Sequence, residues 1–311
     1  MFPRSLTLFR APNASQNLGV VESFLIRNED GLTPLAAHPL FPVGGLEMTS
    51  VGFVPPNHEP GSYVEELQSC YWFALGSETK ILPASTVNAA TARKVAEIEE
   101  EQGRRLGGRA YKRVRDEVLQ DLMPRALSRP GRVQGFYDYL TGVVMIDTAS
   151  RKAAEGVLSE LRKALGSCPA WPVNPEIAPR GILTGWLAGQ PLPPGLALGD
   201  ECLLLDPMDK GARIRCTRQE LTGDEIAQHL EAGKQCAQLQ LTLDERLNFV
   251  LGDDLAIRKL RFLDAAVESI PDEERETARL EGLARFALTV GELRRLFCVL
   301  ADAFQISDWE G

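Results

Sequence analysis

The sequence predicts an α+β fold with antiparallel β-sheets and helices. Strand and helix signals come in blocks, and the lack of regular βα alternation argues against a doubly wound parallel sheet. Residues 239–243 and 247–251 alternate apolar with polar side chains, Gly252, Asp253 and Asp254 mark a turn, and a third apolar run at 257–262 follows, as in an antiparallel meander. The 311 residues are enough for two or three subdomains with sizeable cores.

The first part of the chain mixes short strands with loops. Residues 4–10 alternate polar and apolar side chains and predict a half-buried strand, and residues 18–26 predict a short amphipathic helix. Residues 28–62 contain many Pro and Gly, so we expect mostly loop there. The aromatic run at 69–75 predicts a buried strand.

Residues 80–132 predict two long helices. Good helix formers occupy 89–106, Gly107 and Gly108 interrupt them, and a second helix begins near Arg109. Its apolar residues recur every three or four positions, and Pro124 should kink or end it. We expect an antiparallel hairpin or one long broken rod. The stripe consists of Tyr111, Val114, Val118 and Leu122.

The second half of the chain continues in the same mixed manner. Residues 136–148 predict a strand, and 150–165 predict an amphipathic helix that Gly166 ends. Residues 168–211 are rich in Pro and Gly and resist assignment. A capping box from Thr222 to Glu225 predicts a short helix to Ala232. The end of the chain, 273–304, predicts a helix.

Charge is unevenly distributed. Residues 80–132 hold 12 Lys and Arg against 7 Asp and Glu, a net charge of +5, whereas the whole chain carries −9 and the remainder therefore −14. Six basic residues and no acidic one lie between Arg104 and Arg115. Such a concentration fits a surface for a polyanion, but charge pattern alone favours a solvated helical face whose charges pair internally.

Motifs for chemistry are scarce. The chain has no phosphate-binding glycine loop and no nucleophile elbow, and its three histidines are scattered, so we expect no cofactor and no enzyme activity. Six cysteines lack metal-binding spacing, and we expect them to be buried thiols and no metal to be bound. No signal peptide or membrane span is apparent, which predicts a cytosolic protein with no membrane partner.

The pair Asp253 and Asp254 supports one enzymatic alternative. Clustered carboxylates bind hard cations, so these residues could serve a metal-dependent nuclease or hydrolase. Two aspartates after a glycine between strands are more simply explained as turn residues.

Several motifs, in order and spacing over roughly residues 63–264, resemble the bacterial recombination-associated RdgC family. They are KILP at 80–83, AEIEEEQ at 96–102, RDEVL at 115–119, LMPRALSR at 122–129, MIDTAS at 145–150, LRKALGS at 161–167, QELT at 219–222, HLEAGK at 229–234 and RKLRF at 258–262. The Pro-rich segment 28–60 departs from the family pattern.

The resemblance implies a ring-shaped homodimer, closed by two contacts between subunits, that encircles double-stranded DNA with little sequence preference. It also implies a nucleoid-associated protein that supports replication, restrains RecA-dependent recombination and has no catalytic activity; single-stranded DNA is a further possible partner. By the same resemblance, 1–79 and 133–170 with 235–270 form a central α+β domain, 80–132 with 271–311 a long helical base, and 171–234 a smaller tip.

The resemblance also suggests which residues act. Basic side chains in the matching blocks are expected to contact phosphates, with affinity that falls as salt rises. These candidates are Lys80, Arg93, Lys94, Arg104, Arg215, Arg218, Gln219, Lys234, Lys259 and Arg261. On the strand 257–262, alternation predicts that Arg261 points with Lys259 and that Arg258 points away.

One subunit contact is expected at Leu122, Pro124 and Leu127, where Leu127 replaces an aromatic residue of the family pattern. A protein-interaction scaffold that binds no DNA remains a third possibility beside the DNA-binding ring and the nuclease.

Overall fold

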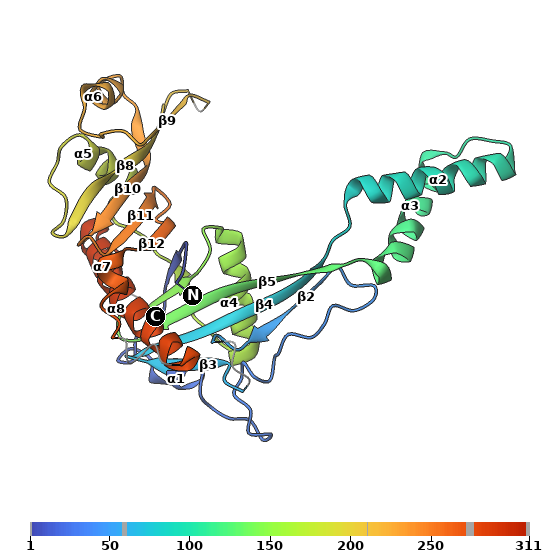
Figure 1. Ribbon diagram of the computed structural model, residues 1–311, viewed down its shortest axis with the longest axis horizontal. Helices are drawn as coiled ribbons and strands as arrows, with labels where there is room; N and C mark the ends of the chain where they lie inside the picture. The colour runs from blue at the N-terminus through green and yellow to red at the C-terminus, as the bar shows by residue number, and fades with distance from the viewer. Residues whose placement is uncertain (1, 58–60, 210, 272–276, 309–311) are drawn as a thin grey trace. The chain divides into compact units, whose positions relative to one another are not determined.

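The computed structural model describes residues 2–57, 61–209, 211–271 and 277–308, and it confirms a mixed α and β fold with antiparallel sheets (Figure 1). Its contacts divide the chain into two compact units. The first comprises Met1–Ala37, Pro55–Ala74 and Val133–Gly311, and the second comprises His38–Val54 and Leu75–Arg132. Two long strands, β4 (Cys70–Lys80) and β5 (Ser128–Asp138), each run from one unit into the other.

One sheet has the strand order β2-β4-β5-β6-β1-β7, with β3 paired to β4. In the first unit, β1 (Thr7–Arg10) lies between β6 (Val143–Ile146) and β7 (Trp171–Pro172), and β3 (Val64–Leu67) pairs with the start of β4. The aromatic run predicted as a buried strand is confirmed, since Tyr71 and Phe73 are buried. Phe24, just after α1 (Leu18–Glu22), stacks on Tyr71 with ring centroids 5.0 Å apart.

Helix α4 (Arg151–Leu165) follows the predicted range closely. Ser150 Oγ accepts the backbone N–H of Ala153 at 3.4 Å, and Gly166 ends the helix with φ +73°, a conformation that favours glycine. Four members of the predicted apolar stripe are buried, namely Ala154, Val157, Leu158 and Leu161, and the fifth, Leu165, is half-buried.

The second sheet lies entirely in the first unit and has the order β12-β11-β10-β8-β9, all antiparallel. It contains the predicted meander. The strands are β8 (Leu196–Leu205), β9 (Arg213–Thr217), β10 (Gln235–Leu243), β11 (Leu247–Gly252) and β12 (Ile257–Phe262). The helices of this half are α5 (Pro179–Leu187), α6 (Asp224–Glu231), α7 (Asp264–Val267) and α8 (Ala278–Phe304).

The second unit is built around the helical pair. Helices α2 (Ala84–Gln102) and α3 (Gly108–Leu122) pack together, and Lys94 Nζ lies 3.2 Å from the Glu117 carboxylate. Lys94 and Glu117 are nearly the same number of residues away from the turn between the two helices. Their contact therefore requires α2 and α3 to be antiparallel, so the hairpin alternative is correct. The short η1 (Met123–Arg125) follows α3. Strand β2 (Thr49–Val54) pairs with β4.

Several elements were not predicted. Strand β2 lies within the Pro-rich stretch expected to be mostly loop, and a Cβ on its Gly52 would lie 2.4 Å from the Pro39 carbonyl oxygen, so glycine permits the close approach there. The unassigned stretch 168–211 holds β7, α5 and β8. The predicted capping box is wrong, because Gly223 is the N-cap of α6 and Thr222 Oγ1 instead donates to the Glu220 carboxylate.

The two compact units do not group the same residue ranges as the predicted domains. Helix α8 belongs to the first unit with the central sheets, whereas the sequence grouped 271–311 with 80–132. The reason is its apolar face, which contributes Leu293, Leu296 and Leu300 to the main core. The start of that predicted helix, 273–276, lies outside the described residues. The division into centre, base and tip stays a prediction about the assembly.

Candidate nucleic-acid interface

The five-stranded sheet has one apolar and one polar face. On β10, Leu239, Leu241 and Leu243 are fully buried, while the alternating Gln240 and Thr242 are half-buried on the opposite side. On the neighbouring strand Leu247, Phe249 and Leu251 are buried and Asn248 is half-buried on the polar side, where Val250 is also buried. Alternation therefore generates a polar sheet surface directly from the sequence.

That polar face is hollowed. The hollow has a volume of about 600 Å³ and brings together three of the predicted phosphate-binding residues: Arg218, Lys259 and Arg261. Its remaining lining residues are Asp200, Glu201, Thr217, Gln240, Asn248 and Leu263. Arg218 and Arg261 have no ion-pair partner within the described part of the chain, which leaves their guanidinium groups available to an anion.

The floor of the hollow is a pair of amide side chains. Gln240 Nε2 donates to Asn248 Oδ1 at 2.9 Å, and Gln240 Oε1 accepts the backbone N–H of Asp200 at 3.1 Å. A Cβ on Gly199 would lie 2.7 Å from Gln240 Cγ, so glycine at this position makes room for the amide. The floor is therefore ordered by hydrogen bonds and carries no charge.

Two β-bulges shape the walls. On β8, the residues Gly199, Asp200 and Glu201 fall between the partners of Leu241 and Leu239 on β10, so β8 carries two extra residues there. On β12, one extra residue is inserted near Lys259, whose φ is +53°. Because of that insertion, Ile257 and Leu260 are both buried although they are three residues apart.

The second bulge interrupts the alternation that the sequence suggested for β12. The prediction that Arg261 points the same way as Lys259 nevertheless holds, because both residues line the same hollow. Arg258 is occupied elsewhere: its guanidinium donates to both carboxylate oxygens of Asp254, at 2.9 and 2.6 Å.

Glu201 is the acidic centre of this surface. Its side chain is only 13% exposed, and its two oxygens approach Lys259 Nζ at 2.5 Å and Arg215 Nη1 at 3.4 Å. Sequence reasoning missed this residue, since β8 was unassigned and no residue spacing links position 201 to position 259. It also missed Gln240 and Asn248, although the alternation on β10 and β11 did place both on a polar face.

Gln219 and Lys234 do not line this hollow. Gln219 Nε2 donates to the Glu225 carboxylate at 2.5 Å, and its side chain lines a second hollow of about 410 Å³ together with Arg218. Lys234 Nζ is 3.9 Å from Asp206, and its side chain is only 17% exposed. Hydrogen bonds from two backbone N–H groups, followed by the charge of Lys234, lower the pKa of Asp206.

Lys80 is a structural residue, which corrects its assignment as a phosphate ligand. It is 6% exposed, and its ammonium donates to the carbonyl oxygens of Gly45 at 2.5 Å and Met123 at 2.9 Å. A buried ammonium with two carbonyl acceptors joins three segments of the second unit and is inaccessible to DNA.

The other candidates in the second unit are on the surface. Arg93 and Arg104 are exposed, and Lys94 pairs with Glu117 and Asp121; the hydrogen bond to Glu117 is the main reason that the pKa of Lys94 is raised. The basic run between Arg104 and Arg115 is exposed and has no ion-pair partner within the described residues, so the internal pairing considered from the sequence is not observed for it.

The predicted subunit contact is an exposed surface in this single chain. Leu127 is 79% exposed, Pro124 is exposed and Leu122 is half-buried. Large exposed apolar side chains are typical of interaction sites when they cluster, and Ile81, whose N–H donates to the Leu127 carbonyl, is 48% exposed beside it. The contact itself stays a prediction.

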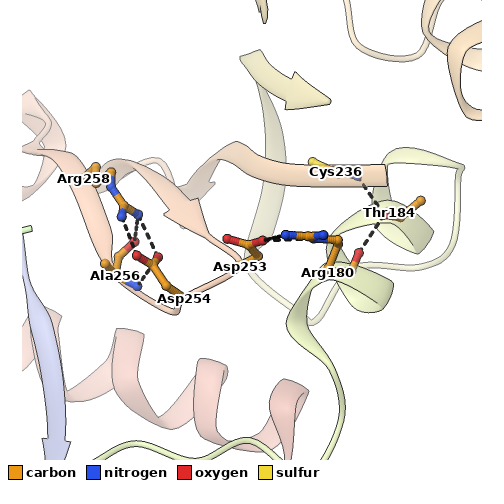
Figure 2. Close-up of polar contacts among 7 residues, drawn as sticks. All are labelled: Arg180, Thr184, Cys236, Asp253, Asp254, Ala256 and Arg258. Atoms are coloured by element: carbon orange, nitrogen blue, oxygen red, sulfur yellow. Dashed lines mark hydrogen bonds and ion pairs between the residues drawn. The ribbon is translucent and has the colours of Figure 1, made fainter. Parts of the chain in front are cut away.

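Asp253 and Asp254 are held apart by separate arginines (Figure 2). Arg180 donates to Asp253, with Nε at 2.9 Å from Oδ2, while Arg258 and the Ala256 N–H donate to Asp254. Burial would raise the pKa of Asp254, but these hydrogen bonds outweigh it and the pKa is lowered. The turn explanation accounts for this geometry.

Arg180 belongs to the same local network. Its carbonyl accepts from Thr184 Oγ1 at 2.6 Å, and Thr184 Oγ1 accepts the backbone N–H of Cys236 at 2.9 Å, which ties α5 to β10 (Figure 2). In the described ranges of the chain, no cluster of three or more His, Cys, Asp and Glu side chains has a geometry that could hold a metal ion.

The cysteines have free thiols. Five are buried, as expected from the sequence, and burial raises the pKa of Cys168 to about 11. Cys298 on α8 is exposed, which corrects the expectation for that residue. Over residues 2–57, 61–209, 211–271 and 277–308, no helix has the length and apolar character needed to cross a membrane.

Fold and surface together define a mixed α/β protein with a hollowed, arginine- and lysine-bearing sheet face and an exposed basic helical hairpin. Comparison with known proteins gives the family. A family model described as "Putative exonuclease, RdgC" matches residues 1–307. The chain belongs to the RdgC family, which is associated with recombination.

Individual relatives align with this chain over all or nearly all of their length. "Recombination-associated protein RdgC" of Xanthomonas campestris pv. campestris is 48% identical over 312 residues, covering 100% of both chains. The protein of the same description from Xanthomonas oryzae pv. oryzae gives the same values, and that from Stenotrophomonas maltophilia is 47% identical over 309 residues, covering 99% of both. The resemblance stated from the sequence motifs is therefore confirmed.

Proposed function

We propose that this chain binds double-stranded DNA without sequence specificity and acts in recombination as a non-enzymatic, DNA-encircling ring dimer. The observation that carries the proposal is the hollow on the five-stranded sheet, where Arg218, Lys259 and Arg261 converge above an uncharged amide floor. Arginine and lysine on a concave surface match the spaced phosphates of a nucleic-acid backbone. Membership of a recombination-associated family supports DNA as the polyanion.

The exposed basic run on the α2–α3 hairpin provides a second contact surface of the same character. Phosphates, rather than base edges, would supply the affinity, in keeping with the lack of sequence preference that the family resemblance implies. Local positive charge then allows an acidic chain with net charge −9 to bind DNA.

The remaining parts of the proposal follow the family. A second copy would join through the exposed surface around Leu127, closing a ring around the duplex. The protein would be cytoplasmic and nucleoid-associated, support replication, and restrain RecA-promoted strand exchange by occupying DNA, with single strands as a further ligand.

Binding to DNA is tested by fluorescence anisotropy. A labelled duplex of about 30 base pairs, in two unrelated sequences, is titrated with protein at several salt concentrations. We expect similar affinities for both sequences and a loss of roughly 10³-fold or more between 50 and 200 mM salt if about six phosphates are contacted. Sedimentation velocity of the same samples reports the dimer. Absence of binding at low salt would overturn the proposal in favour of a protein-interaction scaffold.

The family description "Putative exonuclease, RdgC" supports a second candidate, a nuclease. It is tested by incubating linear duplex and supercoiled plasmid with protein and Mg²⁺ and following acid-soluble nucleotides and nicking over time. We expect neither product. Degradation that is abolished in D253N/D254N would instead establish the nuclease and place its metal at the β11–β12 turn.

A further inference from the structure

The ion pair between Glu201 and Lys259 crosses the width of the hollow. Glu201 is on β8 and Lys259 on β12, and β10 and β11 lie between these strands. Three strand spacings separate them, about 14 Å in a flat sheet. Yet Lys259 Nζ and Glu201 Oε2 are only 2.5 Å apart, so the two side chains meet across the two intervening strands.

Both ends of this ion pair lie at irregularities of the sheet. Glu201 ends the β8 bulge, and Lys259 occupies the left-handed position of the β12 bulge. Bulges redirect side chains, and here they bring two oppositely charged groups over the amide floor formed by Gln240 and Asn248. A regular pair of strands would leave Ile257 and Leu260 on opposite faces and would not produce this arrangement.

The carboxylate of Glu201 engages cations in the way a phosphate would. It accepts hydrogen bonds from Lys259 and Arg215, two residues predicted to contact DNA, while Arg218 and Arg261 in the same hollow have no ion-pair partner within the described residues. Carboxylate and phosphate oxygens compete for the same ammonium and guanidinium donors.

We infer that the Glu201 carboxylate competes with DNA phosphates for Lys259. In the free protein Glu201 is paired with Lys259, and a phosphate must displace Glu201 to contact that lysine. This inference rests on the proposed function. Arg218 and Arg261 would make the first phosphate contacts, and Lys259 would join them when it leaves Glu201. The wild-type affinity is thereby held below the value that the cations alone would give, which favours release and movement along DNA.

The test compares E201Q with wild type in duplex titrations at about 100 mM salt. Glutamine keeps the size of the side chain and removes its charge, and we expect duplex affinity to rise about three- to tenfold, the scale of one partly exposed ion pair plus a nearby repulsive charge. The matched control is D200N, which removes a charge from the adjacent lining residue that has no ion-pair partner within the described residues. We expect it to change affinity by less than about twofold.

A double-mutant cycle isolates the contact. In a K259Q background the gain from E201Q should shrink markedly toward the D200N effect, because only the longer contact with Arg215, at 3.4 Å, is left to release. Equal gains for E201Q and D200N would overturn the inference in favour of general charge repulsion, and unchanged or weaker binding by E201Q would overturn it in favour of Glu201 as a residue that positions the cations. Circular dichroism confirms that each variant folds. Failure of wild type to bind any duplex would instead refute the proposed function.

Discussion

Replacing Arg218, Lys259 and Arg261 together by glutamine is expected to lower affinity for duplex DNA by roughly 10²- to 10³-fold at about 100 mM salt. These are the three cationic side chains that line the hollow of the five-stranded sheet. Each phosphate contact contributes about 0.9 to the slope of log affinity against log salt, so the slope itself should decrease by about 2.7. Anisotropy titrations across a salt series measure both quantities.

A matched control removes the same charge from another surface of the same unit. Arg151, Lys152 and Lys163 are exposed on α4, and two of them pair only with glutamates of the same helix. The variant R151Q/K152Q/K163Q should keep its affinity within about threefold and its salt slope within about one unit. Equal losses in both triple variants would show that net charge, and not the hollow, determines binding.

Much of this surface could be predicted from the sequence. Alternating leucines on β10 and β11 place Gln240 and Asn248 on a polar face, and matching blocks of the family drew attention to Arg218, Lys259 and Arg261. The alternation on these strands and the family motifs are local signals, because each depends on residues close together in the sequence. The fold preserves both.

Other features depend on contacts between distant segments, and no local pattern encodes them. Lys80 has the appearance of a surface lysine in a basic region, but its ammonium is enclosed because Gly45 and Met123, 35 and 43 residues away, present carbonyl oxygens to it. Glu201 meets Lys259 over a separation of 58 residues, through two bulges that interrupt the strand period. The Pro-rich sequence around β2 likewise conceals a strand whose partner, β4, is supplied from elsewhere in the chain.

The uneven charge of the chain also has a physical consequence for binding. The residues outside 80–132 sum to −14, so under the proposed function long-range attraction to DNA would be weak and affinity would depend on close contact with local groups of arginine and lysine. Under the same proposal, Glu201 would act in the hollow itself, where its carboxylate would reduce the positive charge available to a phosphate. Both features would suit the proposed role, in which the protein covers DNA extensively and must still be released.

Removing the buried carboxylate of Asp138 is expected to be the most damaging single change for stability. Asp138 is fully buried at the end of β5, and its oxygens accept from Arg294 Nε at 2.7 Å and Nη2 at 3.0 Å. The backbone N–H groups of Leu140 and Thr141 donate to it as well, and Arg294 also donates to the Gln68 carbonyl. The interaction thus links α8, the β5–β6 turn and the β3–β4 turn of the first unit.

Asp138→Ala removes the carboxylate from two turn N–H groups and from the largely enclosed Arg294 guanidinium, which keeps only the Gln68 carbonyl as acceptor. We expect the free energy of unfolding to fall by about 3–5 kcal/mol, the usual loss when one partner of a buried ion pair is removed. Urea titration followed by far-UV circular dichroism measures it at neutral pH. The control, Glu155→Ala, breaks the exposed Arg151–Glu155 pair on α4 and should cost about 0.5 kcal/mol or less.

If Asp138→Ala proves too unstable to purify, Asp138→Asn provides the measurement. The amide keeps one acceptor oxygen for the turn N–H groups and loses the charge that Arg294 requires, so its loss should fall between those of the alanine variant and the control. A loss below about 1 kcal/mol in Asp138→Ala would show that water or a neighbouring carbonyl replaces the carboxylate, and that α8 is held to the first sheet by apolar packing alone.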